Sequence, residues 1–220
     1  MKTKVRIILI FAICCVFFAC SKKQIDWKSV DSPQLLSGDW EGSDTVLIPK
    51  SKFTLSENTS VDVTIAASCD IDKERVIYAT KFDFSNFLKS AKKEKAFNGK
   101  TEQQIWDDLK QNWTAGDDVV LDKFSVTVRG LTDVDTFGME WEPVLSDDEK
   151  KLRVLYDLSY MLSVGRGTYF TLNKTAKSKL LAVFKEMPDT DIEQSEDAAQ
   201  EQEILQDEAL EADAATFPQR

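Results

Sequence analysis

The sequence predicts an α+β protein that is mainly β, in which antiparallel strands pair as a meander and curl. In several runs between residues 61 and 172, apolar and polar residues alternate, as they do in strands with one buried face. Residues 85–113 interrupt this alternation with helical periodicity. Strands that follow one another in sequence usually pair, so we expect one antiparallel sheet with helices packed over an end or a face.

The first two long strands form the clearest prediction. Apolar residues occupy every second position from Val61 to Cys69, and the same alternation continues from Val76 to Phe84 with Thr80 as its one polar member. Residues 70–74 between the two runs are mostly charged and predict a turn. The two runs therefore predict an antiparallel hairpin.

Two helices are expected next, as an insertion over residues 85–113. Residues 85–97 are rich in lysine and end before Gly99. The second helix begins at a capping box, in which the side chains of Thr101 and Gln104 satisfy each other's backbone N–H groups. Gly116 ends this helix. Its apolar residues share one helical face: Ile105, Trp106, Leu109 and Trp113.

Alternation then resumes and predicts strands at residues 123–129, 137–142, 152–164 and 168–172. The segment Asp133–Gly138 starts like a calcium loop but lacks the later oxygen ligands, which favours a turn between strands. Residues 165–167 predict a tight turn. Asn173 is positioned to cap a final helix that extends to Met187.

Charge is unevenly distributed along the 220 residues, which carry 38 acidic and 28 basic side chains. Residues 189–220 hold eleven acids and one base, so we expect an acidic tail that is disordered or a frayed helix. The net charge of −10 argues against nucleic-acid binding. The chain contains no histidine, which excludes Ser-His-Asp and Cys-His catalysis and histidine metal sites.

Residues 1–19 predict a signal peptide. Three basic residues precede an apolar run over residues 7–19. These thirteen residues are too few to span a bilayer as a helix, which takes roughly 20, but they suit the apolar region of a signal. An ordinary signal peptide and an uncleaved anchor remain the alternatives.

The segment Phe17-Phe18-Ala19-Cys20 resembles the lipobox of bacterial lipoproteins. The resemblance implies cleavage before Cys20, attachment of acyl chains such as palmitate to this residue, and anchoring to a membrane of the cell envelope. It also implies the outer membrane, because Ser21 is not the aspartate that favours inner-membrane retention; the periplasmic and the surface side both stay open. Cys69 is then the one cysteine outside the signal and the anchor, so no intramolecular disulfide is expected.

These features divide the chain into four parts. They are a lipoprotein signal peptide (1–19), a tether (20–34), an antiparallel β domain (35–188) and the acidic tail (189–220).

The opening of the β domain resembles a known family. Residues Leu36–Gly42 read Leu-Ser-Gly-Asp-Trp-Glu-Gly and resemble the Gly-x-Trp opening of lipocalin-like proteins. The resemblance implies an antiparallel barrel whose tryptophan packs across one end and whose interior can hold a hydrophobic ligand. Gly38 and Trp40 are the residues that carry over, as structural residues. Arg153 and Arg166 are candidates for an arginine stacked on Trp40.

Two other groups of charged residues, a glutamate pair and a set of lysines, do not indicate a catalytic site. Glu140 and Glu142 share one face of a predicted strand, and because the opposite face is apolar we expect this face to be solvated. Five lysines form a basic patch: Lys89, Lys92, Lys93, Lys95 and Lys100. We expect a solvated helix face; the alternatives are that the patch contacts anionic lipid headgroups or attracts the acidic tail. No cofactor or metal motif is recognisable.

The function expected from the sequence is therefore non-catalytic. The protein is expected to be a lipid-anchored envelope lipoprotein that binds a hydrophobic small molecule or an envelope partner through a lipocalin-like β domain. The alternative is a structural or protein-interaction lipoprotein with a solid core and no small-molecule ligand.

Overall fold

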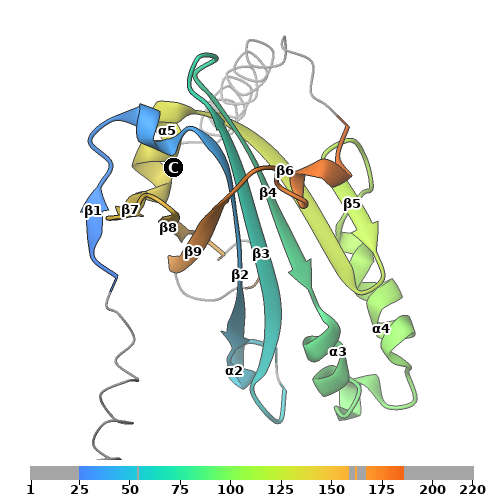
Figure 1. Ribbon diagram of the computed structural model, residues 1–220. Helices are drawn as coiled ribbons and strands as arrows, with labels where there is room; N and C mark the ends of the chain where they lie inside the picture. Colours follow the sequence, from blue (N-terminus) through green and yellow to red (C-terminus); the bar gives the residue numbers. More distant parts are fainter. Residues whose placement is uncertain (1–24, 54, 159–161, 163–166, 186–220) are drawn as a thin grey trace, which may run out of the picture.

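The computed structural model describes residues 25–185, except residues 54, 159–161 and 163–166 (Figure 1). Within this part of the chain, nine strands form one antiparallel sheet in the order β1-β7-β8-β9-β2-β3-β4-β6-β5. The predicted α+β class with an antiparallel sheet is confirmed. The cysteine at position 20 and the acidic tail of residues 189–220 lie outside the described residues.

The strands are short at both edges of the sheet and long in its centre. Their bounds are β1 Trp27–Ser29, β2 Gly38–Ile48, β3 Thr59–Asp70, β4 Arg75–Asp83, β5 Val119–Asp122, β6 Ser125–Asp133, β7 Val144–Ser146, β8 Lys151–Tyr156 and β9 Thr168–Thr175. The helices are α2 Lys50–Phe53, α3 Ser85–Ala91, α4 Glu102–Leu109 and α5 Val134–Trp141, with 3₁₀ turns at Pro33–Leu36, Lys95–Phe97, Lys110–Asn112 and Leu181–Val183.

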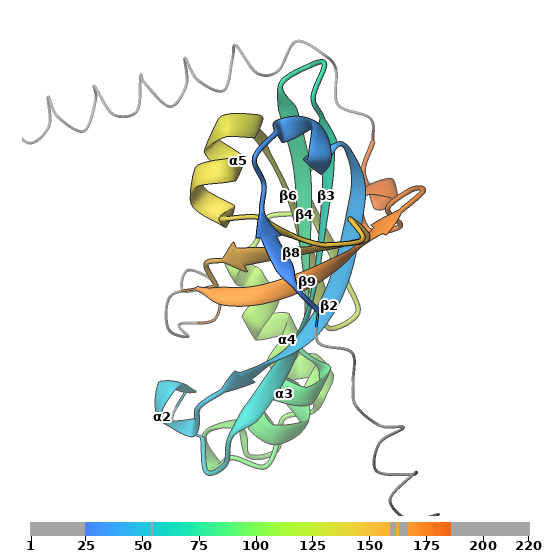
Figure 2. The same cartoon turned by 60° about the vertical axis from the view of Figure 1, so that its left-hand side comes forward.

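The sheet is curled but open. Strands β8 and β9 run across the long strands β2, β3, β4 and β6 (Figure 2). Strand β9 follows β2 for only three residue pairs, from Asp39 with Thr175 to Glu41 with Asn173. The edge strands β1 and β5 do not pair with each other. The barrel that the lipocalin-like resemblance implies is therefore wrong, because the two edges of the sheet never meet.

Local sequence signals identified the β3–β4 hairpin and the two helices of the insertion correctly. Strands β3 and β4 pair antiparallel over nine residue pairs, from Asp62 with Asp83 to Asp70 with Arg75. Both helices of the insertion form, although each is shorter than predicted. The capping box at α4 is present: Thr101 Oγ1 accepts from Gln104 N at 3.2 Å, and Gln104 Oε1 accepts from Thr101 N at 2.8 Å.

The predicted strand over residues 137–142 is wrong, because these residues belong to helix α5 and its C-terminal cap. Asp133 caps the helix through Oδ1, which accepts from Thr136 N at 2.7 Å. Hydrogen bonds from the Thr136 side chain and backbone lower the pKa of Asp133, which keeps the cap ionised. Phe137 and Trp141 lie one helical turn apart and are both buried. The segment from Asp133 is thus a helix start and not a turn.

Two further elements differ from the prediction. Strand β8 ends at Tyr156, and Leu162 N donates to Leu158 O at 2.9 Å, the spacing of a helical turn. The expected strand over residues 152–164 is therefore shorter. Asn173 lies within β9 and does not cap a final helix; the described residues after it contain only the 3₁₀ turn Leu181–Val183.

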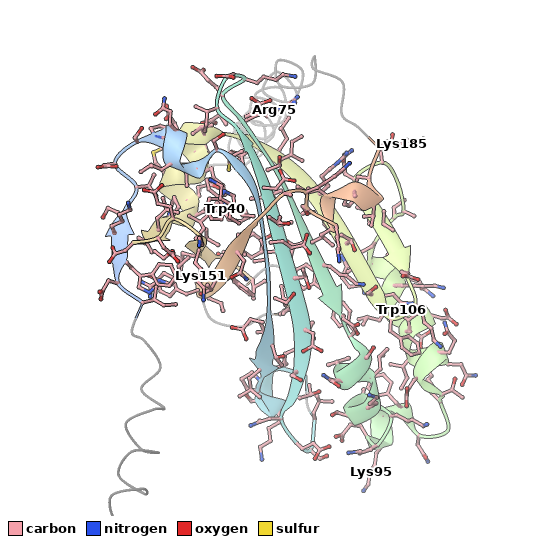
Figure 3. The ribbon with its side chains drawn as sticks, viewed as in Figure 1. Trp40, Arg75, Lys95, Trp106, Lys151 and Lys185 are labelled. Carbon is pink, nitrogen blue, oxygen red and sulfur yellow. The ribbon has the colours of Figure 1, made fainter. Side chains whose placement is uncertain are left out.

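The concave side of the sheet encloses the main core. Helices α3 and α4 cover one end of it and α5 the other, so that Trp106 and Trp40 lie at opposite ends (Figure 3). The largest side chains inside are almost fully buried and fill the interior: Trp40, Phe82, Phe137 and Phe170. The core is thus a packed one, with density expected to approach that of an organic crystal.

The segment after β9 covers part of the other side of the sheet, opposite α5 (Figure 2). Leu180 packs on Ala66 and Ala79, whose short side chains leave room for it. Glu41 Oε2 accepts from Ser178 Oγ at 2.8 Å and from Lys179 N at 2.9 Å. This carboxylate holds the segment where a helix had been predicted.

Candidate functional site

The residues of the Gly-x-Trp motif lie at the start of β2 and not before the first strands. Gly38 has a φ of +106°, a conformation that favours glycine. Trp40 is fully buried, and its Nε1 donates to Leu36 O at 2.7 Å. The cation near its ring is Lys174, whose Nζ lies 5.1 Å from the ring centroid. The expected stacking of Arg153 on Trp40 is not seen, and Arg166 lies outside the described residues.

The motif contains a third residue whose role the sequence analysis missed. A Cβ on Gly42 would lie 2.2 Å from Thr171 O and 3.0 Å from Leu172 Cα. Gly42 therefore allows β9 to cross β2 closely. The repeated spacing of Gly38, Trp40 and Gly42 was the signal that could have identified it.

The structure places Arg153 in a surface groove between α5 and β1. We call this groove, of about 430 Å³, the α5–β1 groove; it is lined by Ser29, Val30, Asp31, Pro33, Leu36, Val134, Asp135, Gly138, Met139, Glu142, Pro143, Val144, Arg153 and Tyr169. It draws on β1, on the 3₁₀ turn before β2, on α5, and on strands β7 to β9. No single segment of sequence forms it.

Strand alternation explains why Arg153 points away from the core. Its neighbours Leu152 and Val154 are fully buried, so the side chain between them faces the opposite side of β8. There the guanidinium carbon lies over two rings, which we call the aromatic clamp: it is 4.8 Å from the centroid of Trp27 and 5.2 Å from that of Tyr169. Both rings stabilise the cation through their quadrupoles.

The guanidinium has no acceptor among the described residues. Arg153 Nε is buried and makes no hydrogen bond, and no described carboxylate forms an ion pair with this side chain. A buried donor without an acceptor costs about 1–3 kcal/mol. Arg153 therefore lines the groove as a cation without an ion-pair partner in the described part of the chain.

The other walls of the groove carry three carboxylates and two exposed apolar side chains. Asp31, Asp135 and Glu142 line it, and within the described part of the chain none of them forms an ion pair. Met139 is 73% exposed and Tyr169 is 54% exposed. Methionine, tyrosine and arginine are residue types enriched in interfaces.

A second groove of about 440 Å³ lies on the other flank of α5, against Tyr78, Glu140, Trp141, Leu155, Tyr156 and Asp157. The ring centroids of Trp141 and Tyr156 are 4.7 Å apart, and those of Trp141 and Tyr78 are 5.1 Å apart. Burial and the charge of Glu140 raise the pKa of Tyr78. Burial also raises the pKa of Tyr156, whose hydroxyl accepts from Thr80 Oγ1 at 3.0 Å. These rings mainly close the core.

The remaining candidates from the sequence are the Glu140–Glu142 pair and the basic patch of lysines. Glu140 is in α5 and Glu142 is its left-handed C-cap residue, so they do not share a strand face. Three lysines of the basic patch pair with acids: Lys92 with Glu102 at 3.6 Å, Lys93 with Glu57 at 2.9 Å and Lys100 with Asp108 at 2.6 Å. The patch is therefore partly neutralised.

Cys69 lies in β3 with its thiol in the core. Burial, aided by the nearby charge of Asp39, raises its pKa to about 12. Because the thiolate is the reactive form, this cysteine is expected to be inert in the folded protein.

Fold and site together define an α+β protein with an open antiparallel sheet and a polar surface groove. Comparisons with known protein families, with curated proteins and with solved structures found no match. Over the described residues, no group of three or more Cys, Asp and Glu side chains is placed to hold a metal ion. Within the same residues, no helix is long and apolar enough to cross a membrane.

Proposed function

We propose that this protein is a non-catalytic envelope lipoprotein, lipidated at Cys20, which binds an envelope component in the α5–β1 groove. The observation that carries the proposal is Arg153, which lies over the rings of Trp27 and Tyr169 and forms no ion pair within the described residues. A cation held in this way at a groove favours recognition, since its donors are already oriented. The lipobox-like segment before Ser21 supports the anchor and the outer-membrane location.

The packed core favours a surface site over an interior one. A carrier of a hydrophobic small molecule needs a cavity lined by apolar groups. Here the inward positions are occupied by Trp40, Phe82, Phe137 and Phe170, each exposed by 1% or less. This packing supports an interaction lipoprotein with a solid core better than a carrier.

Site-specific photo-crosslinking in cells tests the groove. A photoreactive residue replaces Met139, on the groove rim, and in a second variant Leu47, which is 61% exposed on β2 outside the groove lining. We expect a defined adduct, identified by mass, from position 139 and none from position 47. No adduct at 139, or the same adduct at both positions, would refute the groove as the binding site.

The anchor is tested independently. Growth with labelled palmitate should label the wild-type chain, and Cys20→Ala should abolish the labelling. A labelled Cys20→Ala chain, or an unlabelled wild-type chain, would contradict lipidation at this residue.

A further inference from the structure

The α5–β1 groove presents both signs of charge to a ligand. One wall holds the Arg153 guanidinium, and the other walls hold Asp31, Asp135 and Glu142. A simple anion meets three carboxylates there, and a simple cation meets the guanidinium. A zwitterion places each of its charges opposite the complementary one, so the groove selects for a molecule with two charges of opposite sign.

The guanidinium favours phosphate as the anionic part of that molecule. Its planar fork of N–H groups matches phosphate oxygens in bidentate geometry. The guanidinium carbon lies over the rings of Trp27 and Tyr169, and contacts of this kind do not use its N–H groups as hydrogen-bond donors. Arg153 forms no ion pair within the described residues, so a phosphate in the groove would meet no competing carboxylate partner on this side chain.

The carboxylates favour a primary ammonium as the cationic part. An ammonium group carries three N–H donors on one small centre, and carboxylate oxygens are acceptors without donors. Asp135 lies in the first turn of α5, Glu142 is the C-cap residue of this helix, and Asp31 lies in the segment after β1. All three line the α5–β1 groove together with Arg153.

The position of β1 in the chain points to the source of the zwitterion. Trp27 follows Cys20 by seven residues, which span at most about 25 Å when fully extended. A chain lipidated at Cys20 therefore keeps the aromatic clamp close to the bilayer. Tryptophan and tyrosine are the side chains typical of the membrane–water interface. Exposed Met139 and Tyr169 on the rim suit the glycerol and first acyl carbons of a lipid.

We propose that the α5–β1 groove binds the phosphoethanolamine headgroup of a phospholipid in the membrane that holds the anchor. Arg153 binds the phosphate, and the carboxylates bind the ammonium. This inference deepens the proposed function and rests on it for the location of the lipid.

The test titrates the purified full chain, in an uncharged maltoside detergent, with glycerophosphoethanolamine, a soluble headgroup. Binding is followed calorimetrically. Glycerol phosphate and ethanolamine serve as half-ligands, and the dipeptide glycylglycine serves as a zwitterion with a carboxylate in place of the phosphate. We expect glycerophosphoethanolamine to bind at least about tenfold more tightly than each of the other three.

Variants assign the roles. Arg153→Gln should weaken binding of glycerophosphoethanolamine by about tenfold or more. Asp135→Asn should weaken it less and should shift the preference toward glycerol phosphate, an effect that a merely misfolded variant would not show. The matched control is Lys123→Gln, which removes another cation held over a ring, 5.5 Å from the Phe124 centroid, but outside the groove.

The outcomes separate the two proposals. No binding of glycerophosphoethanolamine, equal binding by the Arg153→Gln variant, or tighter binding of glycylglycine would overturn the headgroup assignment. Headgroup binding by a chain that is not labelled with palmitate would refute the anchor and leave the groove chemistry supported. Labelling together with an adduct at position 139, but without headgroup binding, would leave the proposed function standing and refute this inference.

Discussion

Replacing Gly42 with alanine tests how the sheet is curled. The added Cβ would lie 2.2 Å from Thr171 O, whereas real Cβ contacts essentially never fall below 3.0 Å. The obstructing atoms belong to the backbone of β9, so no rotamer change can relieve the contact. Overpacking of a core costs about 1–3 kcal/mol, and a rigid backbone obstacle places this variant at the upper end, near 3 kcal/mol.

Urea denaturation of the full chain, followed by tryptophan fluorescence, measures the effect. In a thermal melt of the same protein, a loss of about 3 kcal/mol corresponds to a Tm lower by roughly 6–12 °C for a chain of this size. The control is Gly138→Ala in the middle of α5, where a Cβ meets no heavy atom within 4 Å. It should raise stability by about 0.5–1 kcal/mol, because alanine is the better helix former. A Gly42→Ala protein within about 0.5 kcal/mol of wild type would refute the close crossing of β2 and β9.

Further predictions concern three single side chains. Trp40→Phe should cost about 2 kcal/mol in urea denaturation, because the buried Leu36 carbonyl loses its 2.7 Å donor; an unchanged midpoint would contradict this. Thr101→Ala removes the α4 cap and should cost about 1 kcal/mol by the same assay, unless the helix does not depend on its capping box. Cys69 should not react with a thiol reagent at pH 8 until the chain is unfolded, and rapid labelling of the native protein would show that its burial is wrong. Because the thiol pKa is about 12 when folded and 9.0 when unfolded, its contribution to stability should be constant below pH 9 and decrease as the pH rises from there to about 12. A Cys69→Ala variant with the same alkaline slope would contradict this assignment.

The elements that sequence alone predicted are those decided by neighbouring residues. The β3–β4 hairpin follows from strict alternation at Val61, Val63 and Ile65 and from the charged turn after it. The start of α4 follows from the hydrogen-bonding capacity of Thr101 and Gln104. In each case, the local signal and the tertiary packing agree.

Helix α5 was missed because its sequence satisfies two periods. Phe137, Met139 and Trp141 alternate as in a strand, while Val134, Phe137 and Trp141 also share one helical face. The distinction comes from the cap at Asp133 and from the packing of Trp141 beside two tyrosines of β4 and β8. That packing depends on strands distant in sequence, so periodicity could not reveal it.

The groove could be predicted only in part. Arg153 is a candidate from the sequence to stack on an aromatic ring, but the ring expected there is Trp40, whereas the structure places Arg153 over Trp27. Its partner Trp27 belongs to a segment that was interpreted as a tether, and it reaches β8 because β1 pairs with β7 at Ser146. Pairing between such distant segments leaves no mark in local composition.

The pairing of β1 also has a mechanical consequence. Strand β1 is held by three residue pairs with β7 and by the ion pair of Lys28 with Glu149 at 2.8 Å. In a chain fixed at Cys20, a pull on the anchor reaches this short strand before any other part of the sheet. Its release would lengthen the free segment after the anchor from seven residues to the thirteen that precede Pro33, and its reach from about 25 Å to about 45 Å. The same extension would draw Trp27 away from Arg153, so tension on such an anchor would open the aromatic clamp.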